Sequence, residues 1–294
     1  MMKKALVIIN PHAGRMKLLR DLPEVDTILY NGGYEADVYF TKCRGDATAK
    51  VLKSASNYDL VVCGGGDGTY NEVISGVVKS GLDILVGYIP AGTTNDFAST
   101  LELSPVHKTA AQQIVLGTPK RIDVGLFGDR YFSYIASFGA FTSSSYSANQ
   151  KMKNTLGHLA YVLEGLRDLS TLKPFRVKVE TDEEIIEDDF IFGAVCNSRS
   201  IAGLIKLDEK IVDLSDGRFE VILIRMPRQI IEVPKIITAL QTGSKTDKNV
   251  VFAHSNTVKF TTSGVLDWSL DGEHATSSGE IELRNIHEAI SLIL

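Results

Sequence analysis

The sequence predicts an α/β protein with an N-terminal, doubly wound and largely parallel α/β nucleotide-binding domain and a C-terminal β-rich sandwich domain. Three observations lead to this expectation. Apolar strand-like segments alternate with helix-like segments from Ala5 to about Asp123, which is typical of a parallel sheet with right-handed crossovers. Polar, glycine-containing loops follow three of these strands. Beyond Asp123, short strand-like runs rich in serine, threonine and aromatic residues dominate, as in antiparallel sandwiches.

The overall composition is that of a soluble globular protein. The 294 residues, 44% of them hydrophobic and 23% charged, suggest one large or two ordinary domains. The net charge of −5 disfavours nucleic acid as the main partner. The three cysteines, Cys43, Cys63 and Cys196, form no CxxC pair and no disulfide framework. This cysteine pattern fits a reducing, cytoplasmic setting. No apolar run is long enough to span a membrane.

The N-terminal elements follow from apolar runs and from the turn residues between them. Pro23 is expected to break a partly helical stretch over residues 15–30, and Gly45-Asp46 is expected to open a helix. Strands are expected at residues 5–9, 36–41, 59–62 and 83–89, and helices at residues 47–52 and 70–80.

The C-terminal elements read as many short strands with two helices. Leucines at helical spacing predict a core-facing helix over residues 156–169, and a proline in the first turn supports a short helix over residues 234–240. Strands are expected at residues 131–137, 175–181, 189–197, 218–224, 258–262 and 280–283. The domain limits that follow are residues 1–123 and residues 124–294.

The chain is organised around residues 61–73, where a buried strand meets a glycine-rich turn and then a helix. Backbone N–H groups at such a turn and at a helix start carry partial positive charge and suit a phosphate group. A tight turn without a ligand is the alternative. The residue types favour the phosphate site, because glycines bracket an acid and are followed by hydroxyl, amide and carboxylate side chains: Gly65, Gly66, Asp67, Gly68, Thr69, Asn71 and Glu72.

Three polar loops follow carboxyl ends of predicted strands, at residues 10–14, 64–72 and 92–96. Open α/β sheets place ligands at that edge, so we expect these loops to converge on one crevice. Thr41, at the end of the second strand, would join them.

The motifs together resemble the diacylglycerol/sphingosine lipid kinase family, most closely its soluble bacterial members. The resemblance rests on Gly65-Gly66-Asp67-Gly68-Thr69 with Asn71-Glu72, on residues 90–98, and on Asp271-Gly272-Glu273. Asn10-Pro11 with Gly14, Thr41 with Gly45-Asp46-Ala47, and Asp216-Gly217 extend it over almost the whole chain. The Gly-Gly-Asp-Gly-Thr motif alone is shared with NAD kinases and, more loosely, with phosphofructokinases.

The resemblance implies ATP and Mg²⁺ at the glycine-rich loop. In the family this loop binds nucleotide phosphates through its backbone, so Asp67 would act with Mg²⁺ and Asp96 would orient the lipid hydroxyl or a water on the metal. By the same analogy the nucleotide contacts are Asn10, Thr41, Gly65, Gly66, Asp67, Gly68, Thr69, Asn71, Glu72 and Thr94.

The resemblance also makes Glu273 the general base that takes the proton from the lipid hydroxyl, as phosphoryl transfer needs. A plain hairpin turn at Asp271-Gly272 is the alternative, and both hold if the turn presents the base. The family has a second, structural Mg²⁺ site that would map to the Asp216 side chain with carbonyls of Asp213 and Arg218. A tight turn before strand 218–224 explains Asp216-Gly217 equally well.

Two departures from the family pattern stand out. Residues 202–207 lack the usual second glycine and the later proline, which puts substrate-side contacts in doubt, and Ala13 stands where serine is common. The last segment, near residues 289–294, returns to the first domain in the family.

These features predict an ATP-dependent, Mg²⁺-dependent lipid kinase with its active site in the cleft between two domains. Diacylglycerol is the leading acceptor, while ceramide, sphingoid bases and phosphatidylglycerol stay open. The protein would be cytoplasmic and peripheral at the inner membrane surface, with Lys151 and Lys153 as a small basic point. Oligomeric state is not fixed, and a homodimer stays open. A NAD kinase and a non-catalytic nucleotide- or lipid-binding homologue are the alternatives; intact Asp67, Asp96 and Glu273 count against the latter.

Overall fold

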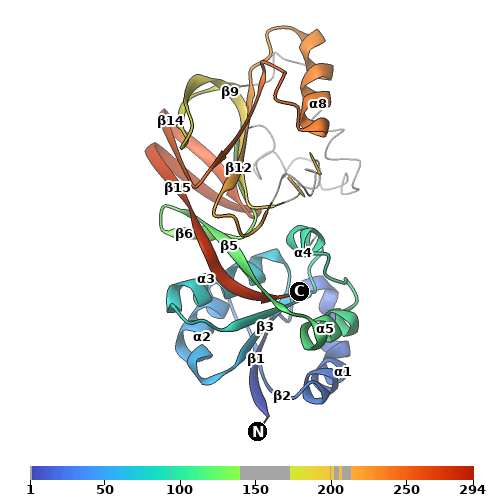
Figure 1. Cartoon of the computed structure of the whole chain (residues 1–294). Helices are drawn as coiled ribbons and strands as arrows, with labels where there is room; N and C mark the ends of the chain where they lie inside the picture. Colours follow the sequence, from blue (N-terminus) through green and yellow to red (C-terminus); the bar gives the residue numbers. More distant parts are fainter. Residues whose placement is uncertain (1, 94, 140–172, 199, 202–204, 207–212) are drawn as a thin grey trace. The chain divides into compact units, whose positions relative to one another are not determined.

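The computed structural model describes residues 2–93, 95–139, 173–198, 200–201, 205–206 and 213–294 (Figure 1). The chain divides into two compact units: unit 1, Met1–Val124 with His287–Leu294, and unit 2, Gly125–Ile286. The helix predicted over residues 156–169, with Lys151 and Lys153, lies outside the described residues.

Unit 1 is built on a parallel sheet in the order β2–β1–β3–β4–β15. The strands are β1 (Lys3–Ile9), β2 (Tyr34–Phe40), β3 (Leu60–Gly65), β4 (Leu85–Pro90) and the C-terminal end of β15 (Glu273–Ile293). All pairs among them are parallel. Strand β3 is wholly buried and β1 is buried from Ala5 to Ile9, as expected for a sheet covered on both faces. The predicted parallel sheet is confirmed.

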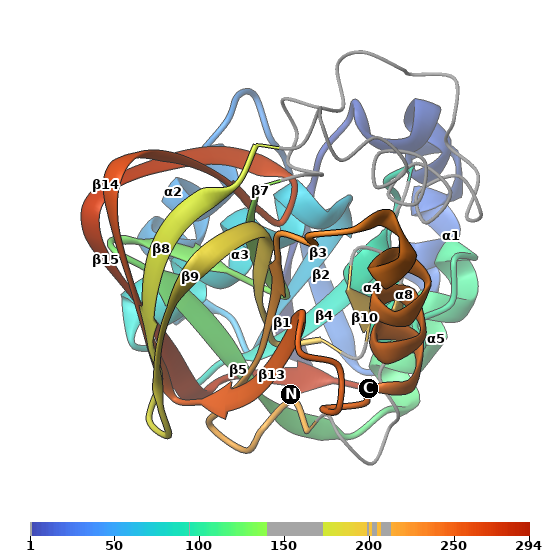
Figure 2. The ribbon, with the colours of Figure 1, turned by 90° about the horizontal axis from the view of Figure 1, so that it is seen from above.

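Helices cover both faces of this sheet (Figure 2). They are α1 (Lys17–Asn31), α2 (Asp46–Ser54), α3 (Asp67–Ser80), α4 (Asp96–Thr100) and α5 (His107–Leu116). Helices α1 and α5 pack together on one side, and α2 and α3 pack together on the other. The short 3₁₀ turns are η1 (Ala13–Met16) and η2 (Ala55–Asn57). The doubly wound arrangement is therefore confirmed.

The expectation that Pro23 breaks the first helix is wrong. Pro23 lies inside α1, which continues to Asn31. A proline removes one backbone donor from the helix, and that loss is tolerated because α1 buries Leu18, Val25 and Leu29 in the core of unit 1. Packing of an apolar face outweighs local propensity here.

Unit 2 is an antiparallel β structure in the order β13–β12–β9–β7–β14–β15. Its strands are β5 (Pro119–Phe127, in part), β6 (Arg130–Phe132), β7 (Ile135–Gly139), β8 (Phe175–Glu180), β9 (Ile185–Cys196), β12 (Phe219–Arg225), β13 (Val250–Ser255) and β14 (Thr257–Leu270). The long strands β9 and β14 each pair with β8 through one half and with β7 through the other.

Smaller elements of unit 2 are also found among the described residues. They are the pair β10 (Ser200–Ile201) and β11 (Ile205–Lys206), the 3₁₀ turn η4 (Ile230–Glu232) and helix α8 (Val233–Thr242). The predicted helix over residues 234–240 is confirmed by α8. Cys43, Cys63 and Cys196 are all free thiols, and burial raises the pKa of the Cys63 and Cys196 thiols well above its ordinary value.

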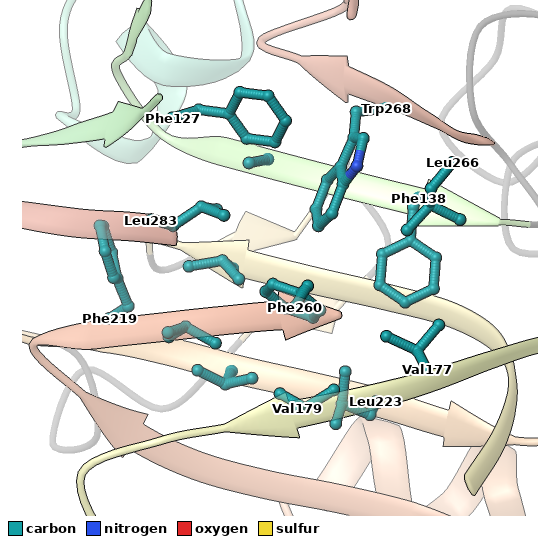
Figure 3. Packing of buried hydrophobic residues seen from close by; sticks show 14 of the residues in the cluster. Phe127, Phe138, Val177, Val179, Phe219, Leu223, Phe260, Leu266, Trp268 and Leu283 are labelled. Atoms are coloured by element: carbon teal, nitrogen blue, oxygen red, sulfur yellow. The ribbon is translucent and has the colours of Figure 1, made fainter. Parts of the chain in front are cut away.

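The core of unit 2 is centred on Trp268, the single tryptophan of the chain (Figure 3). Its ring centroid lies 5.0 Å from that of Phe138 and 5.1 Å from those of Phe127 and Phe260. All three contacts are edge-on, a favoured aromatic geometry. The indole N–H donates to Ser277 Oγ at 2.9 Å, so the polar atom of this buried side chain is satisfied.

Candidate functional site

Three loops of unit 1 come together at the carboxyl ends of β1, β3 and β4. The Asn10 N–H donates to the carbonyl of Gly64 at 2.9 Å, and the Ala91 N–H donates to the carbonyl of Gly65 at 2.7 Å. The Thr41 N–H donates to the carbonyl of Ile9 at 2.9 Å. These bonds bring together the loops that the sequence placed at one edge of the sheet.

Glycine is required where these loops touch. A Cβ on Gly14, whose φ is +52°, would lie 2.0 Å from the carbonyl oxygen of Ala91. A Cβ on Gly92 would lie 2.6 Å from the Cα of Gly66. Both distances are shorter than any real contact, so the backbones of the three loops approach each other too closely for a Cβ at either position.

Side-chain amides fix the shape of the loops. Asn10 Nδ2 donates to Thr69 Oγ1 at 3.2 Å, while its Oδ1 accepts the His12 N–H at 3.0 Å. Asn95 has φ of +53°, and its Oδ1 accepts the Gly92 N–H at 2.9 Å. Asn10 thus ties the first loop to the first turn of α3, and Asn95 closes the third loop on itself.

Two carboxylates stand at helix starts in this cluster. Asp67 is the first residue of α3 and Asp96 is the first residue of α4. Asp67 Oδ2 accepts the Asp96 N–H at 3.0 Å, and the Tyr88 hydroxyl donates to Asp67 Oδ1 at 3.4 Å. Burial, and next the charge of Asp67, raise the pKa of Tyr88 far above its ordinary value, so Tyr88 remains a donor. The positive end of a helix dipole stabilises acidic side chains at these positions.

The backbone around Asp67 suits an anion as well. The first N–H groups of a helix have no intrahelical partner, and in α3 they belong to residues 67–69, directly after the glycines of β3. The N–H groups attract phosphate oxygens, and the hard carboxylate oxygens of Asp67 and Asp96 are the ligands that Mg²⁺ prefers. The residues present therefore fit a magnesium–phosphate ligand.

Glu72 has a structural contact that the sequence did not predict. Its Oε1 accepts the Gly45 N–H at 2.7 Å and its Oε2 accepts the Ala47 N–H at 3.2 Å. Its carbonyl accepts the Thr48 hydroxyl at 2.7 Å. Glu72 therefore holds the start of α2 against α3. Direct contact of Glu72 with a nucleotide stays a prediction, and Thr94 lies outside the described residues.

In unit 2, Asp271 and Gly272 make a two-residue hairpin turn between β14 and β15, with Leu270 paired to Glu273. Both turn residues have positive φ, +50° and +86°, as a type I′ turn requires. The predicted hairpin is confirmed. The turn leaves the half-buried Glu273 as the first residue of β15.

The Asp271 side chain anchors this turn. It is 6% exposed and accepts three backbone N–H groups, those of Ser133, Tyr134 and Ile135, the last two at 3.0 Å. The prediction of one continuous strand over residues 131–137 is wrong, and these bonds explain why. The N–H groups of Ser133 and Tyr134 bond to a carboxylate instead of a strand, so the segment splits into β6 and β7.

The residues expected around a second metal form a tight turn before β12. Asp216 Oδ1 accepts the Arg218 N–H at 2.8 Å, and Gly217 has φ of +74°. Asp213 Oδ1 accepts the N–H and the hydroxyl of Ser215 at 3.1 and 2.9 Å. Across the described ranges, no group of three or more histidine, cysteine or acidic residues is arranged to hold a metal ion. The turn interpretation is confirmed, and metal binding by Asp216 stays a prediction.

Sequence reasoning used Asp123 only as a domain limit, yet it is fully buried. Its Oδ1 accepts the Glu288 N–H at 2.7 Å, which attaches the C-terminal segment to β5 within unit 1. The only local signal is an acid inside an apolar run, Ile122-Asp123-Val124.

Comparisons with known proteins agree on one family. The diacylglycerol kinase catalytic domain matches residues 4–127, and the YegS C-terminal NAD kinase beta sandwich-like domain matches residues 136–292. The diacylglycerol kinase of Bacillus subtilis (strain 168) is 34% identical over 277 residues, covering 93% of this chain and 90% of its own. That of Staphylococcus saprophyticus is 32% identical over 278 residues, with the same coverage.

Solved structures share the fold. A diacylglycerol kinase from Bacillus anthracis str. Sterne gives a TM-score of 0.77 at 22% identity, covering 99% of this chain and 97% of that one. A second structure from that organism gives a TM-score of 0.83 at 24% identity, covering 99% and 95%. The chain therefore belongs to the diacylglycerol kinase family and is a lipid kinase, a phosphotransferase with an alcohol acceptor. Within the described part of the chain, no helix is long and apolar enough to cross a membrane.

Proposed function

We propose that this protein transfers the γ-phosphate of ATP to the free hydroxyl of diacylglycerol and yields phosphatidic acid. The observation that carries the proposal is the loop cluster around Asp67, found in a chain that is 34% identical to a diacylglycerol kinase over 93% of its length. Residues 1–123 would bind the nucleotide, and residues 124–294 would supply Glu273 and the lipid pocket.

The nucleotide would bind through backbone groups of the packed loops. Gly65, Gly66 and Gly68 let the phosphates approach the chain closely, while the N–H groups at the start of α3, at the positive end of the helix dipole, attract their oxygens. Asn10, Thr41, Thr69, Asn71 and Thr94 are the further contacts that the family resemblance implies.

Asp67 would hold Mg²⁺, which neutralises charge on the phosphates when bound, and Asp96 would orient the lipid hydroxyl or a water on the metal. The Tyr88 hydroxyl and the Asp96 N–H, both directed at the Asp67 carboxylate, keep that carboxylate in one orientation. Asp67 is thereby positioned before any ligand arrives, and a positioned group needs no reorganisation during reaction. Asp216, with the carbonyls of Asp213 and Arg218, is proposed as a second, structural cation site.

The chemical step needs one proton acceptor. The hydroxyl oxygen of the lipid forms a bond to the γ-phosphorus, the bond from that phosphorus to the β–γ bridging oxygen breaks, and ADP leaves. Glu273 takes the hydroxyl proton on its carboxylate. The Asp271 anchor fixes the turn that precedes Glu273 within unit 2, and this supports Glu273 as the base. The enzyme would act peripherally at the inner membrane surface, where ATP is supplied and the lipid is embedded.

The test is transfer of labelled phosphate from ATP with Mg²⁺ to a panel of lipids in mixed micelles. Wild type is expected to label diacylglycerol. Glu273→Gln is expected to lower kcat by about 100-fold or more, the usual contribution of a general base. Glu280→Gln is the matched control, because Glu280 is an exposed carboxylate of the same strand.

Other outcomes would overturn parts of the proposal. Full activity of Glu273→Gln would remove Glu273 as the base. Labelling of ceramide, a sphingoid base or phosphatidylglycerol alone would change the acceptor. Labelling of NAD and of no lipid would make the protein a NAD kinase. ATP binding without transfer to any acceptor would favour a non-catalytic role.

A further inference from the structure

Unit 2 exposes two large aliphatic residues that are adjacent in sequence. Ile230 is 56% exposed and Ile231 is 70% exposed. Single exposed hydrophobic residues are normal on protein surfaces, and those elsewhere in the described ranges are single in sequence: Met2, Met16, Tyr30, Val38, Phe40, Leu52, Leu82, Val106, Leu116, Ile185 and Val265. The pair, here called the isoleucine step, places two exposed aliphatic side chains in one short turn, and an exposed apolar surface of this kind suggests a partner.

Local bonds hold the isoleucine step in place. The two isoleucines begin the turn η4, and Glu232 ends it. Glu232 Oε2 accepts the Arg228 N–H at 2.8 Å, and its Oε1 lies 2.7 Å from Lys248 Nζ. The turn is thus closed by polar bonds from Glu232, and its shape does not depend on burying either isoleucine.

Helix α8, which follows the isoleucine step, fills the adjoining part of the core with its own side chains. Helix α8 lies to one side of the sheet (Figures 1 and 2). Its inner positions are already filled by Val233, Ile236, Ala239 and Leu240, all nearly fully buried. The outward positions Pro234 and Lys235 continue the exposed surface that the isoleucine step begins.

The segment that carries the isoleucine step is basic although the chain is acidic. Residues 226–248 contain four basic residues, Arg228, Lys235, Lys245 and Lys248, and only two acidic ones, Glu232 and Asp247, against a net charge of −5 for the whole chain. Lys248 is paired with Glu232. Arg228, Lys235 and Lys245 are exposed and form no ion pair with any other residue that the structure describes.

We propose that the isoleucine step, with Arg228 and Lys235, docks this protein on a phospholipid bilayer that contains anionic lipids. The isoleucines would enter the boundary between headgroups and acyl chains, and the cations would lie over lipid phosphates. The choice of a bilayer rests on the proposed function, because an enzyme whose acceptor is a lipid must reach it there. A second copy of the chain fits less well, since a two-fold contact would bring like charges together.

The first experiment measures partition of the full chain onto vesicles of phosphatidylcholine and phosphatidylglycerol in a 7:3 ratio, by co-sedimentation. Ile230→Ser/Ile231→Ser is expected to lower the partition coefficient at least tenfold. Val106→Ser/Leu116→Ser is the matched control, because it removes two exposed aliphatic residues of unit 1, which are 55% and 82% exposed, and it is expected to change partition less than twofold. Equal effects of the two variants would overturn the proposal.

A charge variant tests the second part of the surface. Arg228→Gln/Lys235→Gln is expected to remove most of the gain that phosphatidylglycerol gives, and to leave partition onto pure phosphatidylcholine unchanged. Unchanged selectivity for the anionic vesicles would contradict a role for these cations. If the double serine variant instead converts a dimer to a monomer in sedimentation velocity and binds vesicles like wild type, the surface joins two copies and the proposal fails.

Activity measurements separate this inference from the proposed function. The double serine variant should keep wild-type turnover of a short-chain, water-soluble diacylglycerol and lose at least tenfold in apparent affinity for long-chain diacylglycerol in vesicles. A protein that binds vesicles through the isoleucine step and phosphorylates no lipid would overturn the proposed function and leave docking in place. If the protein phosphorylates lipid but the serine substitutions leave vesicle binding unchanged, the docking proposal is overturned and the proposed function stands.

Discussion

At the scale of single residues, Asp271 shows how a buried charge can organise a turn. Its carboxylate is almost inaccessible to water and accepts three backbone N–H groups of residues 133–135. A carboxylate buried without partners would be strongly unfavourable. Here the N–H groups supply the compensation, and the left-handed conformation of Asp271 places its side chain under them. The same residue therefore terminates β6, starts β7 and shapes the turn before Glu273.

Asp271→Asn should destabilise unit 2 by about 2–3 kcal/mol, because an amide NH₂ group would face backbone N–H donors that lose their acceptor. Urea unfolding followed by Trp268 fluorescence measures this free energy. Asp267→Asn is the control, since Asp267 is 56% exposed and pairs with the exposed His274, and exposed pairs contribute little. Equal unfolding midpoints for the two variants would show that the three N–H bonds do not stabilise the turn.

At the scale of elements, close packing of the loops after β1, β3 and β4 explains the glycines better than chain flexibility does. Gly14 and Gly81 share a left-handed φ, +52° and +66°, but differ in their surroundings. A Cβ at Gly14 would meet the carbonyl of Ala91, whereas a Cβ at Gly81 meets nothing within 4 Å. The two positions form a matched pair in which only one has a steric conflict.

Gly14→Ala should weaken ATP binding at least tenfold, because the first loop must move away from the third and the nucleotide site changes shape. Gly81→Ala should leave the Kd for ATP within twofold, although both variants bear the cost of alanine at positive φ, about 1 kcal/mol. Calorimetric titration with ATP and Mg²⁺ gives both values. Similar affinities for the two variants would contradict tight packing as the reason for Gly14.

Elements defined by local sequence were predictable. Apolar runs located β1, β3 and β4, the strand-like segment at residues 36–41 located β2, and an Asp-Gly pair located the β14–β15 turn. The observed strand limits differ from the predicted ones where strand pairing continues beyond the apolar run. Strand β3 extends through Gly64 and Gly65 because these residues pair with Ile9 and Pro90. Helix α5 was not expected, and Pro23 did not break α1, because tertiary packing decides in both cases.

In the candidate site, as in the fold, residues in local motifs were predictable and contacts between distant residues were not. The glycines, Asp67 and Asp96 lie in two short motifs, so the sequence alone identified them as candidate site residues. Bonds between distant residues left no local signal: Asp271 and Ser133 are 138 positions apart, and Asp123 and Glu288 are 165 apart. Glu72 is an intermediate case. Its place in a nucleotide motif suggested a ligand contact, while its geometry reveals a link to α2.

At the scale of the whole molecule, each unit has a hydrophobic core of its own among the described residues. One contains Leu18, Val62 and Ile89 of unit 1, and the other surrounds Trp268 in unit 2. Strand β15 contributes residues to both units, pairing with β14 through its first half and with β4 near its end. Because each unit has its own core, a ligand that binds one unit stabilises that unit against local opening first.

Hydrogen exchange followed by mass spectrometry can therefore locate the nucleotide. We expect ATP with Mg²⁺ to slow amide exchange in residues 10–16, 64–72 and 91–98, since these loops form the proposed site. At about 100 times the Kd, exchange that requires the ligand-free state should slow by up to about 100-fold. Amide exchange at the turn of residues 181–184 in unit 2 should be unaffected.

Glu273→Gln should show the same protection as wild type, because it removes a proton acceptor and leaves the phosphate-binding backbone intact. Protection confined to unit 2 would place the nucleotide elsewhere, whereas protection of all three loops in an inactive Glu273→Gln variant would separate binding from catalysis.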